Sequence, residues 1–263
     1  MQLIHAKIHT MAGTILEDGF VCAEHGTITQ IGSCAQGLPS PCGEVWDLQG
    51  AALYPGFLDA HTHLGMWEDG LDFEGDDGNE DTDPVTPHLR AIDAINPLDG
   101  CFREALEAGI TTVLSGPGSA NPIGGQIAAI KTSGRWIDRM IVKAPVAIKM
   151  ALGENPKHVY HGKNQAPVTR MATAALIREQ LFKARSYWEE KRRAEASTQG
   201  GDPDAEELSP PEFDLKCEAL IPALRREIPV HFHAHRADDI FTAMRLGREF
   251  DLDYTIVHAT EGH

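Results

Sequence analysis

One stretch of eleven residues, PGFLDAHTHLG at positions 55–65, constrains the fold of this chain more than any other feature. Its Pro-Gly start and the apolar residues around it predict a buried strand. Side chains alternate between the two faces of a strand, so Asp59, His61 and His63 are expected to point the same way. Buried polar groups need partners, and a single cation can contact both imidazoles. The stretch therefore predicts a metal site.

A solvent-facing edge strand that carries two histidines by chance is the alternative interpretation of the same stretch. Apolar residues in and around it argue against exposure, namely Leu53, Phe57, Leu58, Ala60 and Leu64. We therefore expect a strand that is buried on both sides, and we expect other parts of the chain to supply further metal ligands.

The C-terminal part of the chain has the pattern of a strand–helix–strand unit. Residues 228–235 and 254–259 are strand-like, and residues 238–250 between them have an acidic N-cap and a glycine near their end, as helices do. Parallel strands are joined through such helices, so the pattern predicts a parallel α/β architecture. A long amphipathic helix is expected at 169–196, followed by a polar, breaker-rich loop at 199–211.

Histidines lie at the C-terminal ends of the expected strands. They are His61, His63, His233, His235 and His258. The C-terminal ends of parallel strands form one rim, where the sites of α/β proteins are found, and chance would seldom collect histidines there. Neutral imidazoles suit zinc and its first-row neighbours. A bound metal lowers the pKa of water to about 7, which gives hydroxide at neutral pH.

Residues 1–50 show no helical periodicity. They read as short strands separated by turn signals such as Asp18-Gly19. We expect a small β-rich module here, which would be half of a β-sandwich, followed by the main domain at 51–263.

The composition restricts the partners of the protein. The 263 residues are 42% hydrophobic, enough for a sizeable core, and carry a formal net charge of −16. Such a charge argues against nucleic acid and anionic membranes as partners. No signal-like segment or bilayer-spanning apolar run occurs, so a cytoplasmic protein is expected. Homo-oligomers are compatible with this composition.

The cysteines are five in number and are never spaced as CxxC. They are Cys22, Cys34, Cys42, Cys101 and Cys217. An odd, scattered set predicts reduced structural thiols, and its spacing argues against a zinc site made of thiolates.

Together these motifs resemble the metal-dependent amidohydrolase superfamily. PGFLDAHTHLG is similar to its first-strand signature, and HAHRADD and IVHATEGH resemble its later ligand strands. The segments TPHLRAID, GITTV, GQIAAIKTSG and KMALGENPK are similar to those of imidazolonepropionase-like amidohydrolases. The resemblance covers nearly the whole chain and is specific for the superfamily, but it identifies no substrate.

The resemblance implies a partial TIM-type (β/α)8 barrel with about six of its eight strands. It also implies a hydrolase that attacks an amide, a cyclic amide or a related C–N bond other than a peptide bond. In such enzymes the attacking group is metal-bound hydroxide, and one or two divalent ions, above all zinc, are expected.

The resemblance also implies a ligand set, with His61, His63, His233 and His258 as metal ligands. A further, bridging ligand is either Glu154, which resembles the glutamate of N-acetylglucosamine-6-phosphate deacetylases, or a carboxylated Lys149. Glu154 is favoured, because an unmodified lysine repels cations. A salt-bridged Lys149 and a turn-capping Glu154 remain an open alternative. Candidates for substrate or oxyanion contacts, or for structural roles, are His235, Arg236 and His263.

One element of the family pattern is missing. Family members carry an aspartate after the eighth strand as the general base, and this chain ends at His263, after the sixth expected strand. We therefore expect a fragment of a longer protein and assign no catalytic base. The competing hypothesis is a truncated or degenerate homologue that binds metal without catalysis.

A nucleotide-binding α/β protein is the third hypothesis. It depends only on the glycines between Gly116 and Gly125. This segment contains neither GxxxxGK[ST] nor a GxGxxG that opens a helix, so a tight turn is expected instead.

Overall fold

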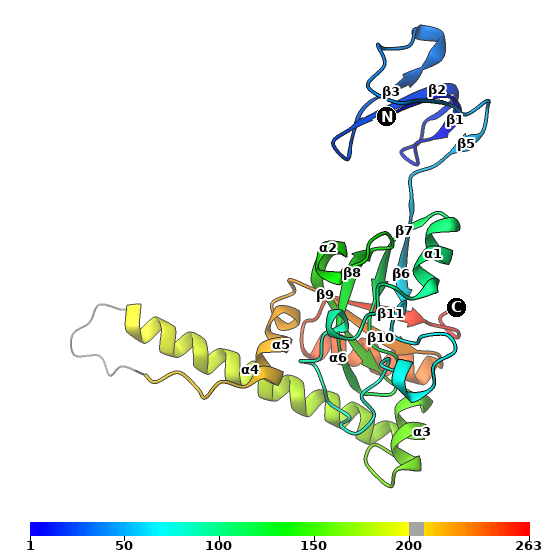
Figure 1. Cartoon of the computed structure of the whole chain (residues 1–263). Helices are drawn as coiled ribbons and strands as arrows, with labels where there is room; N and C mark the ends of the chain where they lie inside the picture. The colour runs from blue at the N-terminus through cyan, green and yellow to red at the C-terminus, as the bar shows by residue number, and fades with distance from the viewer. Residues whose placement is uncertain (200–207) are drawn as a thin grey trace. The chain divides into compact units, whose positions relative to one another are not determined.

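The computed structural model describes residues 1–199 and 208–263, and it divides into two compact units, Met1–Phe57 and Leu58–His263. Each unit has a sheet of its own (Figure 1). Residues 200–207, most of the loop expected at 199–211, lie outside the described part of the chain.

The first unit is a five-stranded sheet in the order β3-β2-β1-β4, and β5 also pairs with β1. A small core of Ala6, Ile8 and Val21 lies on one face. Its elements are β1 (Gln2–His9), β2 (Ile15–Glu24), β3 (Thr27–Ser33), the short 3₁₀ helix η1 (Cys34–Gln36), β4 (Val45–Asp47) and β5 (Ala52–Leu53).

Asp18 and Gly19 do not form the turn that the sequence suggested. They lie inside β2, where Gly19 pairs with Ala6 of β1. A Cβ atom at Gly19 would lie 2.6 Å from the Cδ1 atom of Ile8. The absence of a side chain at Gly19 therefore permits the close packing of β1 against β2, which is one reason why glycine occurs inside strands.

The second unit is built on a six-stranded sheet in the order β11-β10-β9-β8-β7-β6. The strands are β6 (Phe57–Thr62), β7 (Ile110–Ser115), β8 (Ile123–Lys131), β9 (Ile141–Ala151), β10 (Val230–Ala234) and β11 (Tyr254–His258). The helices are η2 (Phe73–Gly75), η3 (Ala91–Asp93), α1 (Gly100–Glu107), α2 (Ile137–Met140), α3 (Glu154–Gly162), α4 (Arg170–Gln199), α5 (Leu215–Leu224) and α6 (Ala237–Glu249).

The sheet is mixed, whereas the sequence predicted a parallel one. β9, β10 and β11 run parallel, and helices connect them as expected. β8, however, is antiparallel to both β7 and β9. The connection from β7 to β8 spans only residues 116–122, which is too short for the crossover that a parallel pair requires. The described residues thus form a mixed α/β fold with a barrel-like sheet of six strands, and they do not form an eight-stranded TIM barrel.

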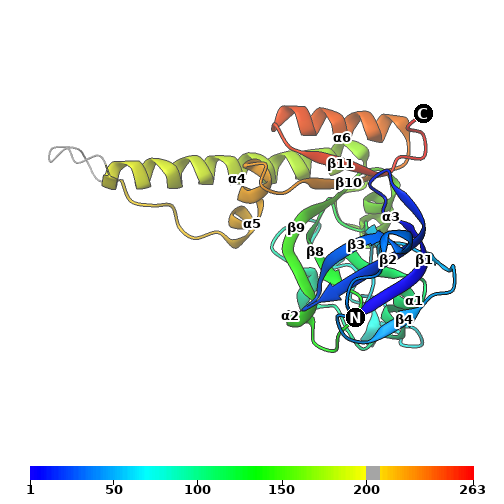
Figure 2. The same cartoon turned by 90° about the horizontal axis from the view of Figure 1, so that it is seen from above.

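The two faces of this sheet differ in chemistry. On β10, Val230 and Phe232 belong to the main core, which also contains residues of α4, α5 and α6. Figure 2 shows α4 and α6 beside β10 and β11. His231 and His233 alternate with these residues and therefore point to the opposite face of the sheet. Burial of the apolar face against the helices thus directs the histidines toward the inner side of the sheet.

The expectation that the first histidine strand is buried on both sides was wrong. β6 is the last strand in the sheet order, and Phe57 and Leu58 are 53% and 61% exposed. The run of apolar residues can be read from the sequence, but the position of their strand within the sheet cannot. An edge strand pairs on one side only, so its apolar side chains can remain in solvent.

Candidate metal centre

Strand ends from distant parts of the sequence bring the histidines of the second unit together. His61 lies in β6 and His63 just after it, while His233 and His258 lie at the ends of β10 and β11. The ring centroids of His61 and His258 are 5.3 Å apart, and those of His233 and His258 are 4.7 Å apart. The two edge strands, β6 and β11, therefore meet through their histidines.

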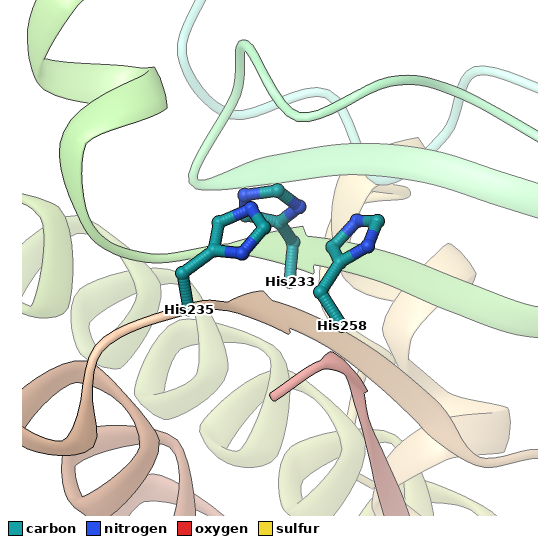
Figure 3. Close-up of side chains that lie close together, drawn as sticks. All are labelled: His233, His235 and His258. Carbon is teal, nitrogen blue, oxygen red and sulfur yellow. The ribbon is translucent and has the colours of Figure 1, made fainter. Parts of the chain in front are cut away.

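His235 belongs to the same group. One ligand atom from each of His233, His235 and His258 lies within 4.8 Å of the others, and Figure 3 shows their rings gathered above β10 and β11. The rings of His235 and His258 are stacked with 4.8 Å between their centroids. From the sequence, His235 was a candidate for substrate contacts, and its position here is also suited to a metal ligand.

Hydrogen bonds fix the orientation of three of these rings. The Nδ1 atom of His63 lies 2.6 Å from the carbonyl oxygen of Gly116. Because a carbonyl only accepts, Nδ1 carries the proton and the Nε2 atom keeps its lone pair. The hydroxyls of Ser119 and Thr260 lie 2.8 Å from the Nδ1 atoms of His233 and His235, respectively. Such partners orient the imidazoles of metal sites.

The environment keeps the imidazoles neutral. Burial, followed by the charges of Lys149 and of neighbouring histidines, lowers the pKa values of His61 and His233 from 6.5 to about 3. Burial also lowers the pKa values of His63 and His258. A neutral imidazole is the form that binds a metal, so these histidines could bind one at neutral pH without losing a proton.

Lys149 lies on the same face of the sheet as the histidines. It pairs in register with His231 of β10, while its neighbours Ile148 and Met150 face the helices. Its side chain is fully buried, and its Nζ atom has no hydrogen-bond partner. Burial lowers its pKa to about 8, which makes the neutral amine accessible near physiological pH.

The other three residues that the sequence proposed lie outside this group. Glu154 begins α3, is exposed, and has a carboxylate oxygen 3.7 Å from a guanidinium nitrogen of Arg170. Arg236 forms an ion pair of 3.0 Å with Asp238. His263 is exposed at the end of the chain. Glu154 lies outside the histidine group because β9 ends at Ala151 and the chain then turns at Gly153 into α3.

Two residues near the histidines went unrecognised in the sequence. Ser119 lies in the Gly-rich segment that was interpreted only as a turn, although its hydroxyl contacts His233. Trp67 packs edge to face on His63, with 5.0 Å between the ring centroids. Neither has a sequence signature, because both reach the site through connections that follow strands and not through the strands themselves.

The residues present fit a divalent cation. Several neutral imidazoles converge, and two buried nitrogen atoms beside them, Lys149 Nζ and His231 Nδ1, have no hydrogen-bond partner. Buried polar atoms without partners are rare in folded proteins. Imidazole nitrogens are preferred ligands of zinc and related transition metals. No carboxylate belongs to the histidine group in the described part of the chain.

The chain is similar in sequence and in fold to a protein of known structure. The crystal structure of an amidohydrolase from Thermotoga maritima superposes on the chain with a TM-score of 0.89 at 40% sequence identity, covering 99% of this chain and 65% of that one. The chain belongs to the amidohydrolase superfamily.

Two curated relatives of this superfamily chain agree. Amidohydrolase tasK of Hapsidospora irregularis is 31% identical over 259 residues, which are 91% of this chain and 26% of that protein. Imidazolonepropionase of Sphingopyxis alaskensis is 40% identical over 63 residues, or 23% of this chain and 15% of that protein. The chain thus spans about a quarter or less of these relatives and about two thirds of the Thermotoga chain. No protein-family model matches it.

The sequence of this amidohydrolase homologue also predicted that no segment spans a membrane. In the described residues, no helix combines the length and the apolar character that a membrane crossing requires.

Proposed function

We propose that this protein is a metal-dependent hydrolase that cleaves an amide, a cyclic amide or a related C–N bond. The observation that carries the proposal is the convergence of neutral histidines from β6, β10 and β11 beside a buried lysine. The names of the Thermotoga and Hapsidospora proteins, both amidohydrolases, support the reaction class. A small molecule is the substrate that we expect.

His61, His63, His233 and His258 would hold the metal, and His235 is placed to join them. A bound zinc ion supplies Lewis-acid polarisation of a carbonyl and lowers the pKa of water. The residues of the chain supply the rest. Ser119 and the Gly116 carbonyl orient two imidazoles, and burial of the site favours their neutral form.

Lys149 is the better candidate for the bridging ligand on this geometry. Its neutral amine can add to carbon dioxide, forming an N–C bond and releasing one proton to solvent, and the product is a carbamate with two oxygen ligands. The carbamate would replace an unpartnered buried amine by an anion among the metal ligands, and it would thereby remove the cost of burying a polar nitrogen without a partner. Glu154 remains the alternative that the sequence favoured.

The test is metal-dependent hydrolysis by the purified intact protein against a panel of small acyclic and cyclic amides. We expect turnover that stops after chelation and returns with zinc, and that the double variant His61→Ala/His63→Ala lacks under all conditions. The variant His158→Ala, which removes an exposed histidine of α3, serves as the matched control and should retain turnover.

A non-catalytic metal-binding homologue is the competing outcome. It would bind zinc at the histidines and hydrolyse none of the amides. Turnover that survives complete chelation would contradict metal dependence itself.

A further inference from the structure

The first unit contains a second group of metal-ligating side chains, distinct in chemistry from the histidine centre. One ligand atom from each of His5, Asp18 and Cys34 lies within 4.8 Å of the others. The three residues come from β1, β2 and η1, and the strands β1, β2 and β3 lie side by side (Figure 2).

Two β-bulges place His5 and Asp18 beside each other. Between the pairs Leu3↔Val21 and Ala6↔Gly19, β1 has one residue more than β2, and His5 lies in this bulge with a φ angle of 55°. Between Ala6↔Gly19 and Ile8↔Leu16, β2 has the extra residue, and this second bulge contains Asp18. A positive φ is uncommon for a residue other than glycine, and bulges re-aim side chains.

The third member follows from the pairing of β2 with β3. Gly19 pairs with Ser33, so Cys34 lies next to Asp18 across the sheet. The Ser33 hydroxyl accepts a hydrogen bond from the backbone N–H of Ala35 and thereby caps η1, which fixes the start of the turn that carries Cys34. The thiol of Cys34 interacts with the carboxylate of Asp18 and with the backbone of His5.

The distances suit a small cation. The Nδ1 atom of His5 lies 3.0 Å from the Oδ1 atom of Asp18. In a tetrahedral site with metal–ligand bonds of about 2.0–2.3 Å, ligand atoms are about 3.3–3.8 Å apart. Only small shifts of exposed or half-buried side chains separate the observed arrangement from that spacing.

The donor set selects the metal. Magnesium and calcium take oxygen ligands almost exclusively, whereas one imidazole, one carboxylate and one thiolate together match the preferences of zinc. We propose that His5, Asp18 and Cys34 bind a zinc ion in the first unit, with a water molecule as the fourth ligand. The bound ion would tie the turn after β3 to β1 and β2.

A surface ion pair between His5 and Asp18 is the simpler interpretation of the same residues. Their side chains are 44% and 57% exposed, and a pair so exposed contributes little to stability. That interpretation gives no reason for the two adjacent bulges or for the positive φ angle of His5. A metal site accounts for all three features with one interaction.

Binding of one zinc ion at this site should release one proton, from the thiol of Cys34. Burial and the nearby Asp18 carboxylate raise the pKa of the Cys34 thiol, so the thiol is protonated before binding. Zinc would displace one proton from the sulfur to solvent and would replace the hydrogen bond between His5 and Asp18. No oxidant or other reactant takes part in this step.

Cobalt(II) is the probe that separates this site from the histidine centre. It occupies zinc sites, and a sulfur-to-cobalt charge-transfer absorption in the near ultraviolet requires a thiolate ligand. The histidine group of the second unit includes no cysteine in the described part of the chain. We therefore expect the charge-transfer band in the intact protein and also in His61→Ala/His63→Ala.

Cys34→Ser should abolish the band, and His5→Gln and Asp18→Asn should weaken cobalt binding at least tenfold. The matched control is Cys42→Ser, which removes a half-buried thiol of the same unit outside the cluster. Circular dichroism establishes that each variant is folded. The absence of the band from the folded wild-type protein would overturn the proposal, and so would a band that Cys42→Ser abolishes while Cys34→Ser retains it.

Discussion

The imidazole of His61 meets that of His258 edge to face, with 5.3 Å between the ring centroids and an angle of 84° between their planes. These residues lie on β6 and β11, the two strands at the opposite ends of the sheet order. The six-stranded sheet therefore curves until its two edge strands face each other. These strands are not paired through their backbones, and the gap between them is bridged by the side chains of His61 and His258. The histidine centre is the place where this curvature brings the two edges together.

Ser119→Ala should weaken metal binding at the histidine centre. The Ser119 hydroxyl lies 2.8 Å from the Nδ1 atom of His233 and orients its ring. Removal of such a partner typically lowers metal affinity by about 10- to 100-fold. Zinc titration in competition with a chelator measures the change, and Ser209→Ala, at an exposed position, is the control. Equal affinities of the two variants would contradict an orienting role for Ser119.

The metal-free protein should lose stability in acid through its histidines. In the folded chain the pKa values of His61 and His233 are about 3, compared with an ordinary value of 6.5. Between these values the unfolded state binds more protons, so the free energy of unfolding falls as the pH falls from about 6.5 toward 3. Above 6.5 these two residues add no pH dependence.

Thermal unfolding of the chelated protein at a series of pH values measures this decline. His61→Gln and His233→Gln should each flatten it, while His158→Gln should leave it unchanged. A melting temperature that stays constant between pH 7 and pH 5 would show that the imidazoles are not held in their neutral form.

Substitutions at Lys149 and Glu154 should separate the two candidate bridging ligands. Lys149→Met keeps the volume of a buried side chain and removes its nitrogen. If Lys149 is carboxylated, this change lowers the metal content, whereas loss of an unmodified ammonium would raise metal affinity. Glu154→Gln should leave the metal content unchanged, because Glu154 is exposed and paired with Arg170. Elemental analysis of the purified variants measures both effects, and metal loss in Glu154→Gln alone would reverse the assignment.

Arg170→Ala should destabilise the second unit strongly. The side chain of Asp239 is only 4% exposed, and its Oδ1 atom accepts a hydrogen bond of 2.9 Å from the Nε atom of Arg170. Loss of one partner of a buried ion pair leaves an uncompensated charge, which costs about 3–5 kcal/mol. Urea unfolding measures this loss. The control Arg225→Ala breaks an exposed pair with Glu227 and should cost less than about 1 kcal/mol.

The period-two spacing of the histidines predicted that they gather at one place, because side-chain alternation in a strand is a local property. It placed His61, His233 and His258 on strands whose ends converge. The choice between Glu154 and Lys149 could not be made in the same way. It depends on where β9 ends and on which residue of β10 pairs with Lys149, and both are properties of the assembled sheet.

Strand order and irregularity were also beyond the reach of the sequence pattern. Phe57 and Leu58 have the same apolar character whether their strand is central or at an edge. Asp18-Gly19 is a frequent turn dipeptide, and only the pairing of Gly19 with Ala6 shows that the segment is a bulged strand. Cys34 was dismissed as a ligand on its sequence spacing, although its candidate partners come from neighbouring strands.

The meeting of β6 and β11 at their histidines has a kinetic consequence. These strands are the first and the last of the second unit, so their contact closes a loop that contains nearly the whole unit, and closing it costs chain entropy before any contact compensates. Contacts of such long sequence separation form late in folding. A ligand that needs both strands therefore recognises only the finished sheet, and it should slow unfolding while leaving the rate of folding almost unchanged.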